Sequence, residues 1–226
     1  MTDKAISKPY ITSDNQEQNH LPPKQVREHI LRDIKEAQRN NLPLTGNYAG
    51  FNFTGTDLTG VIFERANLQK ANFTGAQLGQ TVFVGCNMAG ADFSDQDIPL
   101  PPHPRQGDGL VFNACYLKGA NMQNLHAPYS VFSNMNTLAH APMLREMPSL
   151  DGLDMQTGLL LEVNMAGARF ENSNFNNVVA YKLCARKASF ELVALNQVTF
   201  IDADVAGANL NVARAKATIN SQSFNL

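Results

Sequence analysis

The sequence lacks an excess of charge and a long apolar run, and each absence excludes a class of protein. Lysine and arginine number 18 against 20 acidic residues, which leaves a net charge of −2. Neither a basic nucleic-acid-binding surface nor a strongly acidic chain is therefore indicated. No stretch is long enough to span a membrane, and residues 1–20 are too polar for a signal peptide.

Cysteine is scarce and tryptophan is absent. Cys86, Cys115 and Cys184 lack the spacing of a disulfide framework or a zinc site, which suits a reducing compartment. No phosphate-binding loop or nucleophile elbow is present. The sequence therefore predicts no enzyme: it offers no catalytic residues, no metal ligands and no cofactor site. We expect a cytoplasmic protein of a bacterium.

The chain has a period of five instead. In "AGFNFTGTDLTGVIFERANLQKANFTGAQL", residues 49–78, a large apolar residue stands at every fifth position: Phe53, Leu58, Phe63, Leu68, Phe73 and Leu78. A strand repeats its apolar face every two residues and a helix every 3.6, so neither element explains the pattern. A small residue stands two places before many of the large ones, often with asparagine or aspartate between them. Repetition at a fixed period indicates a solenoid, here with one small and one large inward residue per unit.

The repeated unit has a recognisable consensus. The segments ANLQK, ANFTG, ADFSD and ANLNV match A(D/N)LXX as they stand. In these segments the chain resembles the pentapeptide-repeat family, over residues 46 to about 220. The resemblance implies an all-β solenoid, a right-handed quadrilateral β-helix with four five-residue sides per coil. It implies little about function, because the family shares a scaffold rather than a chemistry.

The register of large residues predicts about eight coils and two inserted loops. The five-residue spacing of the inward positions continues without a break over residues 48–98, 112–137 and 150–220. The first break contains "PLPPHPRQGDG" and the second "AHAPMLREM", so we expect surface loops near 99–109 and 139–148. Their lengths correspond to inserts of nine and eight residues. At about 4.8 Å per coil, the rod is about 38 Å long.

The β-helix is predicted to occupy residues 43–226, and the chain before it lacks the period. Residues 1–21 are polar and are expected to be disordered. Residues 22–42 predict an amphipathic helix with the apolar stripe Val26, Ile30, Leu31 and Ile34. We expect this helix to cover the open end of the first coil, which would otherwise invite aggregation. Its alternative role is to dock a partner away from the rod.

One face of the predicted rod is unusual. On three faces the residue before a large one is usually polar, but on the fourth it is Ile62, Val82, Val111, Val131, Leu159, Val179, Thr199 or Ile219. This pattern is typical of a regular parallel sheet, because β-branched residues suit strands. It is also typical of a contact face. The candidate interaction face is its C-terminal section: Leu159, Leu161, Val179, Tyr181, Ile201 and Ile219.

The C-terminal end of the rod predicts an assembly. After Asn220 only "SQSFNL" remains, which covers little of the last coil. We therefore expect a homodimer through the C-terminal coils, with a monomer as the alternative. A weaker candidate site is an acidic patch beside the first loop, Asp92, Asp95 and Asp97, for which a solvated surface is the simpler interpretation.

Two functional classes remain. The first is a non-enzymatic protein-interaction scaffold whose protein partner is unidentified, with secretion as a bacterial effector as one version. The second follows from the resemblance: some pentapeptide-repeat proteins with two inserted loops protect DNA gyrase from quinolones by imitating duplex DNA. Here outward acids alternate with lysine and arginine, whereas a DNA mimic needs one dominant sign. The sequence therefore favours the scaffold, without direct nucleic-acid binding.

Overall fold

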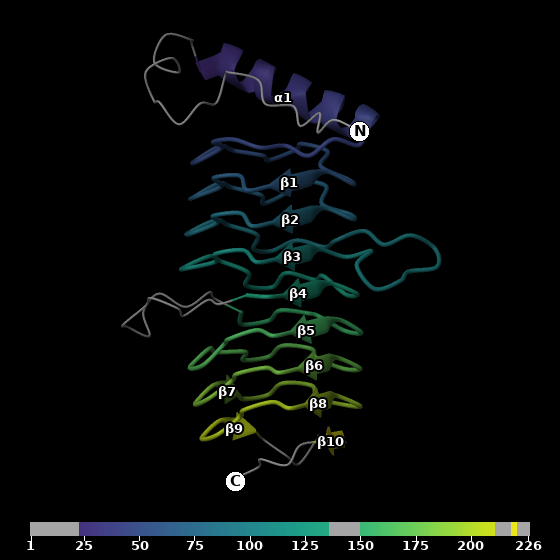
Figure 1. The fold of residues 1–226 in the computed structure, drawn as a ribbon, viewed down its shortest axis with the longest axis vertical. Coiled ribbons are helices and arrows are strands. Elements are labelled where there is room, and N and C mark those ends of the chain that lie inside the picture. The colour runs from purple at the N-terminus through teal and green to yellow at the C-terminus, as the bar shows by residue number, and fades with distance from the viewer. Residues whose placement is uncertain (1–22, 136–149, 211–217, 221–226) are drawn as a thin grey trace.

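The protein is a helix followed by a rod of stacked coils (Figure 1). The structure is a computed structural model that describes residues 23–135, 150–210 and 218–220. Helix α1 is Pro23–Asn40. Eight short strands form one parallel sheet along the rod: β1 (Ile62–Glu64), β2 (Val82–Val84), β3 (Val111–Asn113), β4 (Val131–Ser133), β5 (Leu159–Leu161), β6 (Val179–Tyr181), β8 (Thr199–Ile201) and β10 (Thr218–Asn220). A second parallel pair joins β7 (Ser189–Phe190) to β9 (Asn209–Leu210).

Strand pairing confirms the four-sided coil and the length of both inserts. Phe63 pairs with Phe83, twenty residues later, as four sides of five residues require. Val82 pairs with Val111, so the coil with the first insert is nine residues longer. Val131 pairs with Leu159, so the next insert adds eight. The loop predicted near 139–148 itself lies outside the described residues.

The last strand departs from the predicted register by one residue. Thr218 pairs with Thr199, and Ile219 pairs with Phe200. The sequence register instead aligned Ile219 with Thr199 and made Asn220 the inward residue, which is wrong. The coil between these strands has nineteen residues rather than twenty. The hydrogen-bonded ladder fixes which residues align, so a coil one residue short moves every later residue by one position.

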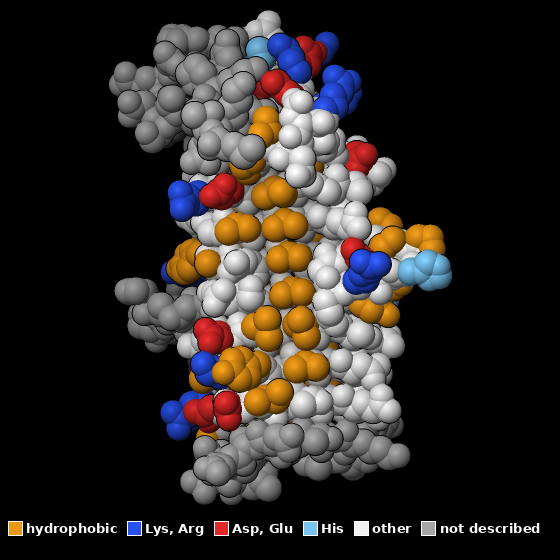
Figure 2. Space-filling model, turned by 45° about the vertical axis from the view of Figure 1, so that its right-hand side comes forward, with side chains coloured by type: hydrophobic (Ala, Val, Ile, Leu, Met, Phe, Trp, Pro, Cys, Tyr) orange, Lys and Arg blue, Asp and Glu red, His pale blue; other side chains and the backbone are white. Residues whose placement is uncertain are grey.

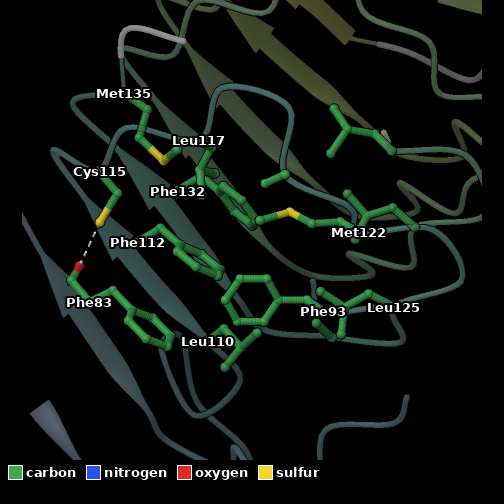
Figure 3. Close-up of a cluster of buried hydrophobic side chains, with 14 of the residues drawn as sticks. Phe83, Phe93, Leu110, Phe112, Cys115, Leu117, Met122, Leu125, Phe132 and Met135 are labelled. Atoms are coloured by element: carbon green, nitrogen blue, oxygen red, sulfur yellow. Dashed lines mark hydrogen bonds between the residues drawn. The ribbon is translucent and has the colours of Figure 1, made fainter. Parts of the chain in front are cut away.

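The interior of the rod takes one large and one small residue from most quintets. Phe73 is fully buried, as the period predicts, and its ring stacks on Phe93 with centroids 4.5 Å apart. Figure 3 shows a section of this core, where Phe112 lies between Phe83 and Phe132. The small positions also bind the coils together: Cys115 Sγ donates a hydrogen bond to the carbonyl oxygen of Phe83 at 3.3 Å.

Asparagine and aspartate recur in the repeat because their side chains hold its corners. The Asn67 side-chain oxygen accepts a hydrogen bond from Gln69 N–H at 3.2 Å, and Asp57 accepts one from Thr59 N–H at 2.9 Å. Such side-chain contacts two residues along the chain stabilise a tight turn. The strands of the eight-stranded sheet do not use this device, and β-branched residues stand there instead.

Helix α1 covers the first coil, and this confirms its predicted capping role. Ile30, Ile34 and Ala37 are buried in the main core, and Val26 and Leu31 pack against it half-buried. Burying this stripe removes the apolar end of the rod from water. The edge of the first coil also has backbone carbonyl groups, at Asn52, Asp57 and Thr59, that face the helix rather than a preceding coil.

Two helix side chains satisfy part of that exposed edge. Arg27 Nη1 donates to the carbonyl oxygen of Asn52 at 2.5 Å. Gln38 Nε2 donates to the carbonyl oxygens of Asp57 at 3.2 Å and Thr59 at 3.1 Å. An edge whose backbone groups are occupied cannot template the addition of another strand.

Candidate interaction face

The outward side chains of the main sheet form two columns along the rod. Each strand of β1–β6 and β8 buries its central residue and leaves the first and third half-exposed. Because the strands pair in parallel register, first residues align with first residues and third with third. The leading column is Ile62, Val82, Val111, Val131, Leu159, Val179 and Thr199. The trailing column is Glu64, Val84, Asn113, Ser133, Leu161, Tyr181 and Ile201.

The apolar surface of this face widens toward the C-terminal coils. The leading column is apolar from β1 to β6, which gives the continuous stripe in Figure 2. The trailing column is polar at Asn113 and Ser133 but apolar at Leu161, Tyr181 and Ile201. Glu64 is the one charged residue of both columns in β1–β6 and β8. The widest apolar section therefore lies on β5, β6 and β8.

Five of the six residues predicted for the interaction face come together here. Leu159 pairs with Val179, and Leu161 with Tyr181, which in turn pairs with Ile201. Each of these side chains is half-exposed. The sixth, Ile219, aligns with the inward residue Phe200 by its backbone pairing and does not continue the leading column. The described C-terminal limit of the face is thus β8.

Charged residues close the trailing edge of this apolar section. Lys182 Nζ lies 5.0 Å from the centre of the Tyr181 ring and 3.1 Å from a carboxylate oxygen of Glu162. The hydrogen bond from Lys182 to Glu162 is the main cause that raises the pKa of Lys182 above its ordinary value. An apolar centre with a polar border is the usual anatomy of a protein interface.

The acidic patch predicted beside the first insert does not form one site. Asp92 accepts hydrogen bonds from the Ser94 N–H and hydroxyl and so closes its own corner. Asp95 accepts a hydrogen bond from the side-chain amide of Asn124 at 2.7 Å. Asp97 lies on the next side of the coil, where its backbone pairs with His126 of the following coil. The three carboxylates thus belong to two sides and the corner between them.

Sequence reasoning missed two exposed apolar residues outside the sheet face. Tyr116 is 36% exposed and stands in the column where Asn67 and Asn87 hold corners. Leu192 is 62% exposed and has a left-handed backbone, with φ 57°. The signal that could have found both is a large apolar residue at a repeat position that otherwise holds asparagine or glycine.

The cysteines are placed for packing rather than for chemistry. Cys86 and Cys115 are buried at small inward positions, and Cys184 is half-buried. A hydrogen bond with Cys86, together with burial, raises the pKa of the Cys115 thiol, which keeps it protonated. Within residues 23–135, 150–210 and 218–220, no group of three or more histidine, cysteine or acidic side chains could hold a metal ion. No helix in the same ranges is long and apolar enough to cross a membrane.

Comparison with known families agrees with this geometry. Residues 49–83 and 71–95 match the model for pentapeptide repeats, with eight copies. Residues 49–95 are therefore pentapeptide repeats. No curated protein matches its sequence.

Solved pentapeptide-repeat and related proteins resemble the chain at low identity. Full-length QnrB1, a plasmid-mediated fluoroquinolone resistance protein, is 12% identical over 79% of this chain and 93% of its own, with a TM-score of 0.37. HetL, which is involved in heterocyst differentiation regulation in Nostoc sp. strain PCC 7120, is 17% identical over 85% and 98%, with a TM-score of 0.28. Rfr23 from Cyanothece 51142 is 12% identical over 80% and 94%, with a TM-score of 0.20.

The pentapeptide repeat separates residues that the coil needs from residues that it does not. The coil needs its inward pair, and on three sides it uses asparagine or aspartate at the corners. The two outer columns of the main sheet serve neither purpose. Polar residues are compatible with the strands there, as Asn113 and Ser133 show. The apolar side chains on β5, β6 and β8 therefore go beyond what the fold requires.

Proposed function

We propose that this pentapeptide-repeat protein is a non-enzymatic protein-interaction scaffold whose contact surface is the apolar face of β5, β6 and β8. The observation that carries the proposal is the continuity of half-exposed apolar side chains across three paired strands, with no charge among them. Contiguous exposed apolar surface of this kind marks interfaces more often than scattered apolar residues do.

The dimensions of the face limit the partner. Strands about 4.8 Å apart give the two columns of β1–β8 a length of about 30 Å, and two outward residues span about 7 Å across. The apolar stripe alone is thus about 200 Å² in projection, well below the roughly 800 Å² per partner of a stable complex. A partner must also contact the polar flanks, such as Tyr129, Thr157 and Asn177, which supply a rim.

A second copy of the chain is the first partner to test. The apolar section lies near the C-terminal end of the described rod, and two such faces related by a two-fold axis would cover each other. This arrangement is the homodimer through the C-terminal coils that the sequence predicts. It would bury Leu161 and Tyr181 of both copies at the centre, where interface residues contribute most.

Sedimentation equilibrium of the intact protein provides the test. We expect a dimer at about 10⁻⁵ M, the concentration at which a moderate interface is occupied. The variant with Leu161→Asp and Tyr181→Asp should sediment as a monomer. Thr54→Asp with Gln123→Asp is the matched control, because both residues are exposed on the side of the rod opposite the sheet. This control should leave the mass unchanged.

A monomeric wild type would exclude a second copy of the chain as the partner. The scaffold function would then be tested by using the protein to capture partners from a lysate. Partners captured by the wild type and the control but lost from the Leu161→Asp, Tyr181→Asp variant would support the face. If that variant keeps every captured partner, the contact surface lies elsewhere.

The alternative function, binding of gyrase by DNA mimicry, needs a surface of one sign. Here several acids of the C-terminal coils lie beside basic partners: Arg186 is 3.2 Å from Asp204, and Arg169 is 3.0 Å from both Asp151 and Glu171. These pairs favour the scaffold over the mimic. A supercoiling assay with and without a quinolone separates the two functions, since only a mimic should change gyrase activity or its inhibition.

A further inference from the structure

The first insert has a composition that restricts its own backbone. In "PLPPHPR", residues 99–105, four prolines each fix their own φ near −65°. The residue before a proline is pushed to the extended or polyproline II region, and this applies to Ile98, Leu100, Pro101 and His103. Such a segment loses little conformational entropy when it binds, because few conformations are open to it in the free protein.

The segment begins against the rod, where Pro99 Cγ would lie 3.4 Å from a Cβ added at Gly79. The insert projects beside β3 in Figure 1 and stands out to the side of the apolar stripe in Figure 2. Pro99 and Pro102 are exposed, whereas Pro101 and Pro104 are half-buried. In a polyproline II helix, with three residues per turn, positions 99 and 102 lie on one edge. The chain bends at Pro102 and His103, so the straight part of the segment ends there.

The base of the insert is fixed by hydrogen bonds. The Asp108 carboxylate accepts one from Gln80 Nε2 at 3.0 Å and another from the Arg105 N–H at 2.6 Å. Gly107 N–H donates to the carbonyl oxygen of Tyr129 at 2.8 Å. One residue earlier, the side-chain amide of Gln106 donates to the carbonyl oxygen of Thr157, on the flank of β5. The insert is therefore held against three successive coils while Pro99 and Pro102 remain exposed.

We propose that residues 99–105 are a docking ligand for a partner domain with an aromatic-lined groove for proline-rich segments, the chemistry of SH3 and WW domains. Pro99 and Pro102 enter the groove, and Leu100 fills the space between them. Arg105 lies beyond the bend and pairs with an acidic residue at the groove's rim. This site is separate from the apolar face of β5, β6 and β8, so each can fail without the other.

Because this chain has no tryptophan, all tryptophan fluorescence in a mixture comes from the partner domain. Tryptophan fluorescence from a panel of purified SH3 and WW domains, titrated with the full-length protein, reports binding in the partner's groove alone. We expect at least one domain to bind with a Kd below about 1 mM, the weakest affinity that such a titration resolves. The Pro99→Ala, Pro102→Ala variant should bind that domain at least about tenfold more weakly, equivalent to a loss of about 1.4 kcal/mol.

The matched control is Pro101→Ala with Pro104→Ala. It removes the same number of prolines from the same insert, so the added chain flexibility is similar, but the residues removed are half-buried. We expect a change of less than about threefold for this control, since only contacts on the exposed edge are lost in the test variant. Far-UV circular dichroism should show an unchanged fold for both variants, because the insert lies outside the buried core.

Two results would overturn the proposal. The first is the absence of any binding by either class of domain at about 1 mM. The second is binding that both double variants weaken equally, because then the orientation of the segment seen in the structure does not determine recognition. The oligomeric state of the Leu161→Asp, Tyr181→Asp variant does not enter this test, so the scaffold face and the insert are judged separately.

Discussion

The coils before residue 136 and those after residue 149 follow the same backbone path with different side chains. In the earlier coils the inward columns are rich in phenylalanine, and Phe53, Phe73 and Phe93 stack with interplanar angles of 9° and 6°. In the later coils the main-sheet column passes from Phe132 through Leu160 and Ala180 to Phe200. The coil therefore requires a buried apolar residue at each centre but not a particular one, as expected when burial dominates.

The corners of the two regions differ more than their cores. The second residue after each large inward residue has a left-handed backbone in both regions, except after Ile98, where the first insert begins. Before residue 136 this residue is glycine at Gly50, Gly55, Gly60, Gly75, Gly85, Gly90 and Gly119, and it has a side chain at Arg65, Lys70, Gln80, Asp95, Ala114, Asn124, Tyr129 and Asn134. In the later coils it is mostly a residue with a side chain: Thr157, Glu162, Asn172, Asn177, Lys182, Lys187, Leu192, Gln197 and Asp202.

This difference has an energetic consequence. A left-handed conformation costs a residue with a Cβ atom about 1–2 kcal/mol, less for asparagine and aspartate, and costs glycine almost nothing. A larger share of the later corners is therefore strained, and the core beside them is less aromatic. They also carry ion pairs between coils, such as Lys182 with Glu162, which offset a small part of it. We expect the rod to open first from its C-terminal coils. Four sets of substitutions test this difference in stability between the two regions.

The largest effect is expected in the aromatic core of the earlier coils. Phe73→Ala should lower the free energy of unfolding by about 3–5 kcal/mol, because it removes a fully buried ring and leaves a cavity in the column. Urea denaturation followed by circular dichroism measures the loss. Phe73→Leu is the control and should cost less, since leucine fills inward positions such as Leu68. A loss below about 1 kcal/mol for the alanine variant would contradict the stacked column.

The cap of the earlier coils gives the next effect. Ile34→Ala should weaken docking of α1 by about 2–5 kcal/mol, because Ile34 is 1% exposed against the first coil. Hydrogen exchange should then accelerate in the first coil, and light scattering should detect self-association of the uncovered end. Arg32→Ala, at an exposed helix position, is the control and should leave both readings unchanged. Unchanged exchange in the Ile34 variant would mean that the helix does not protect the coil.

A reciprocal pair of corner substitutions tests the strain directly. Leu192→Gly should stabilise the protein by about 0.5–1 kcal/mol, since glycine relieves the left-handed strain but adds entropy to the unfolded chain. Gly119→Leu should destabilise it by about 0.5–1 kcal/mol, because φ is 63° and the strain exceeds the entropy that leucine removes from the unfolded chain; no atom lies within 4 Å of an added Cβ. Thermal and urea unfolding measure both changes. If both variants change the free energy of unfolding in the same direction, backbone strain at the corners does not distinguish the two regions.

The smallest effect concerns the ion pair of the later coils. The pKa of Lys182 is raised above its ordinary value of 10.5, chiefly by its hydrogen bond with Glu162. The stabilisation is therefore present at neutral pH and is lost as pH rises through the folded-state pKa, above about 10.5. The melting temperature of the wild type should approach that of Lys182→Gln as pH rises from about 9 to 12. A difference between the two proteins that is constant over this range would contradict the assignment.

Much of the fold could be predicted because the five-residue period is local. The inward positions, the two insert lengths and the amphipathic helix all follow from the spacing of apolar residues such as Phe63, Phe83 and Ile34. The prediction failed at Ile219, where one coil has nineteen residues and the backbone pairing moves by one position. A fixed period contains no information about a single missing residue when few large apolar residues follow it.

The candidate sites show the same division between local pattern and contact. The apolar columns of β5, β6 and β8 could be predicted, because outward residues keep their side of the coil. The acidic residues Asp92, Asp95 and Asp97 are close in sequence, but each turns to a different neighbour. Residues five apart in sequence lie on different sides of the rod. Side chains that are close along the chain therefore need not lie close together in space.

The spacing of apolar residues by itself predicted a coil with five-residue sides, its inward residues and the helix that covers its first turn, because those residues must be buried; the number of sides came from the resemblance to pentapeptide repeats. Only the tertiary structure decided which residues meet across coils: Lys182 with Glu162, Cys115 with the Phe83 carbonyl, and Gln106 with the Thr157 carbonyl. These contacts join residues about a coil or more apart in sequence. Their pairing depends on insert lengths and on backbone hydrogen bonds between coils, which local preference does not specify.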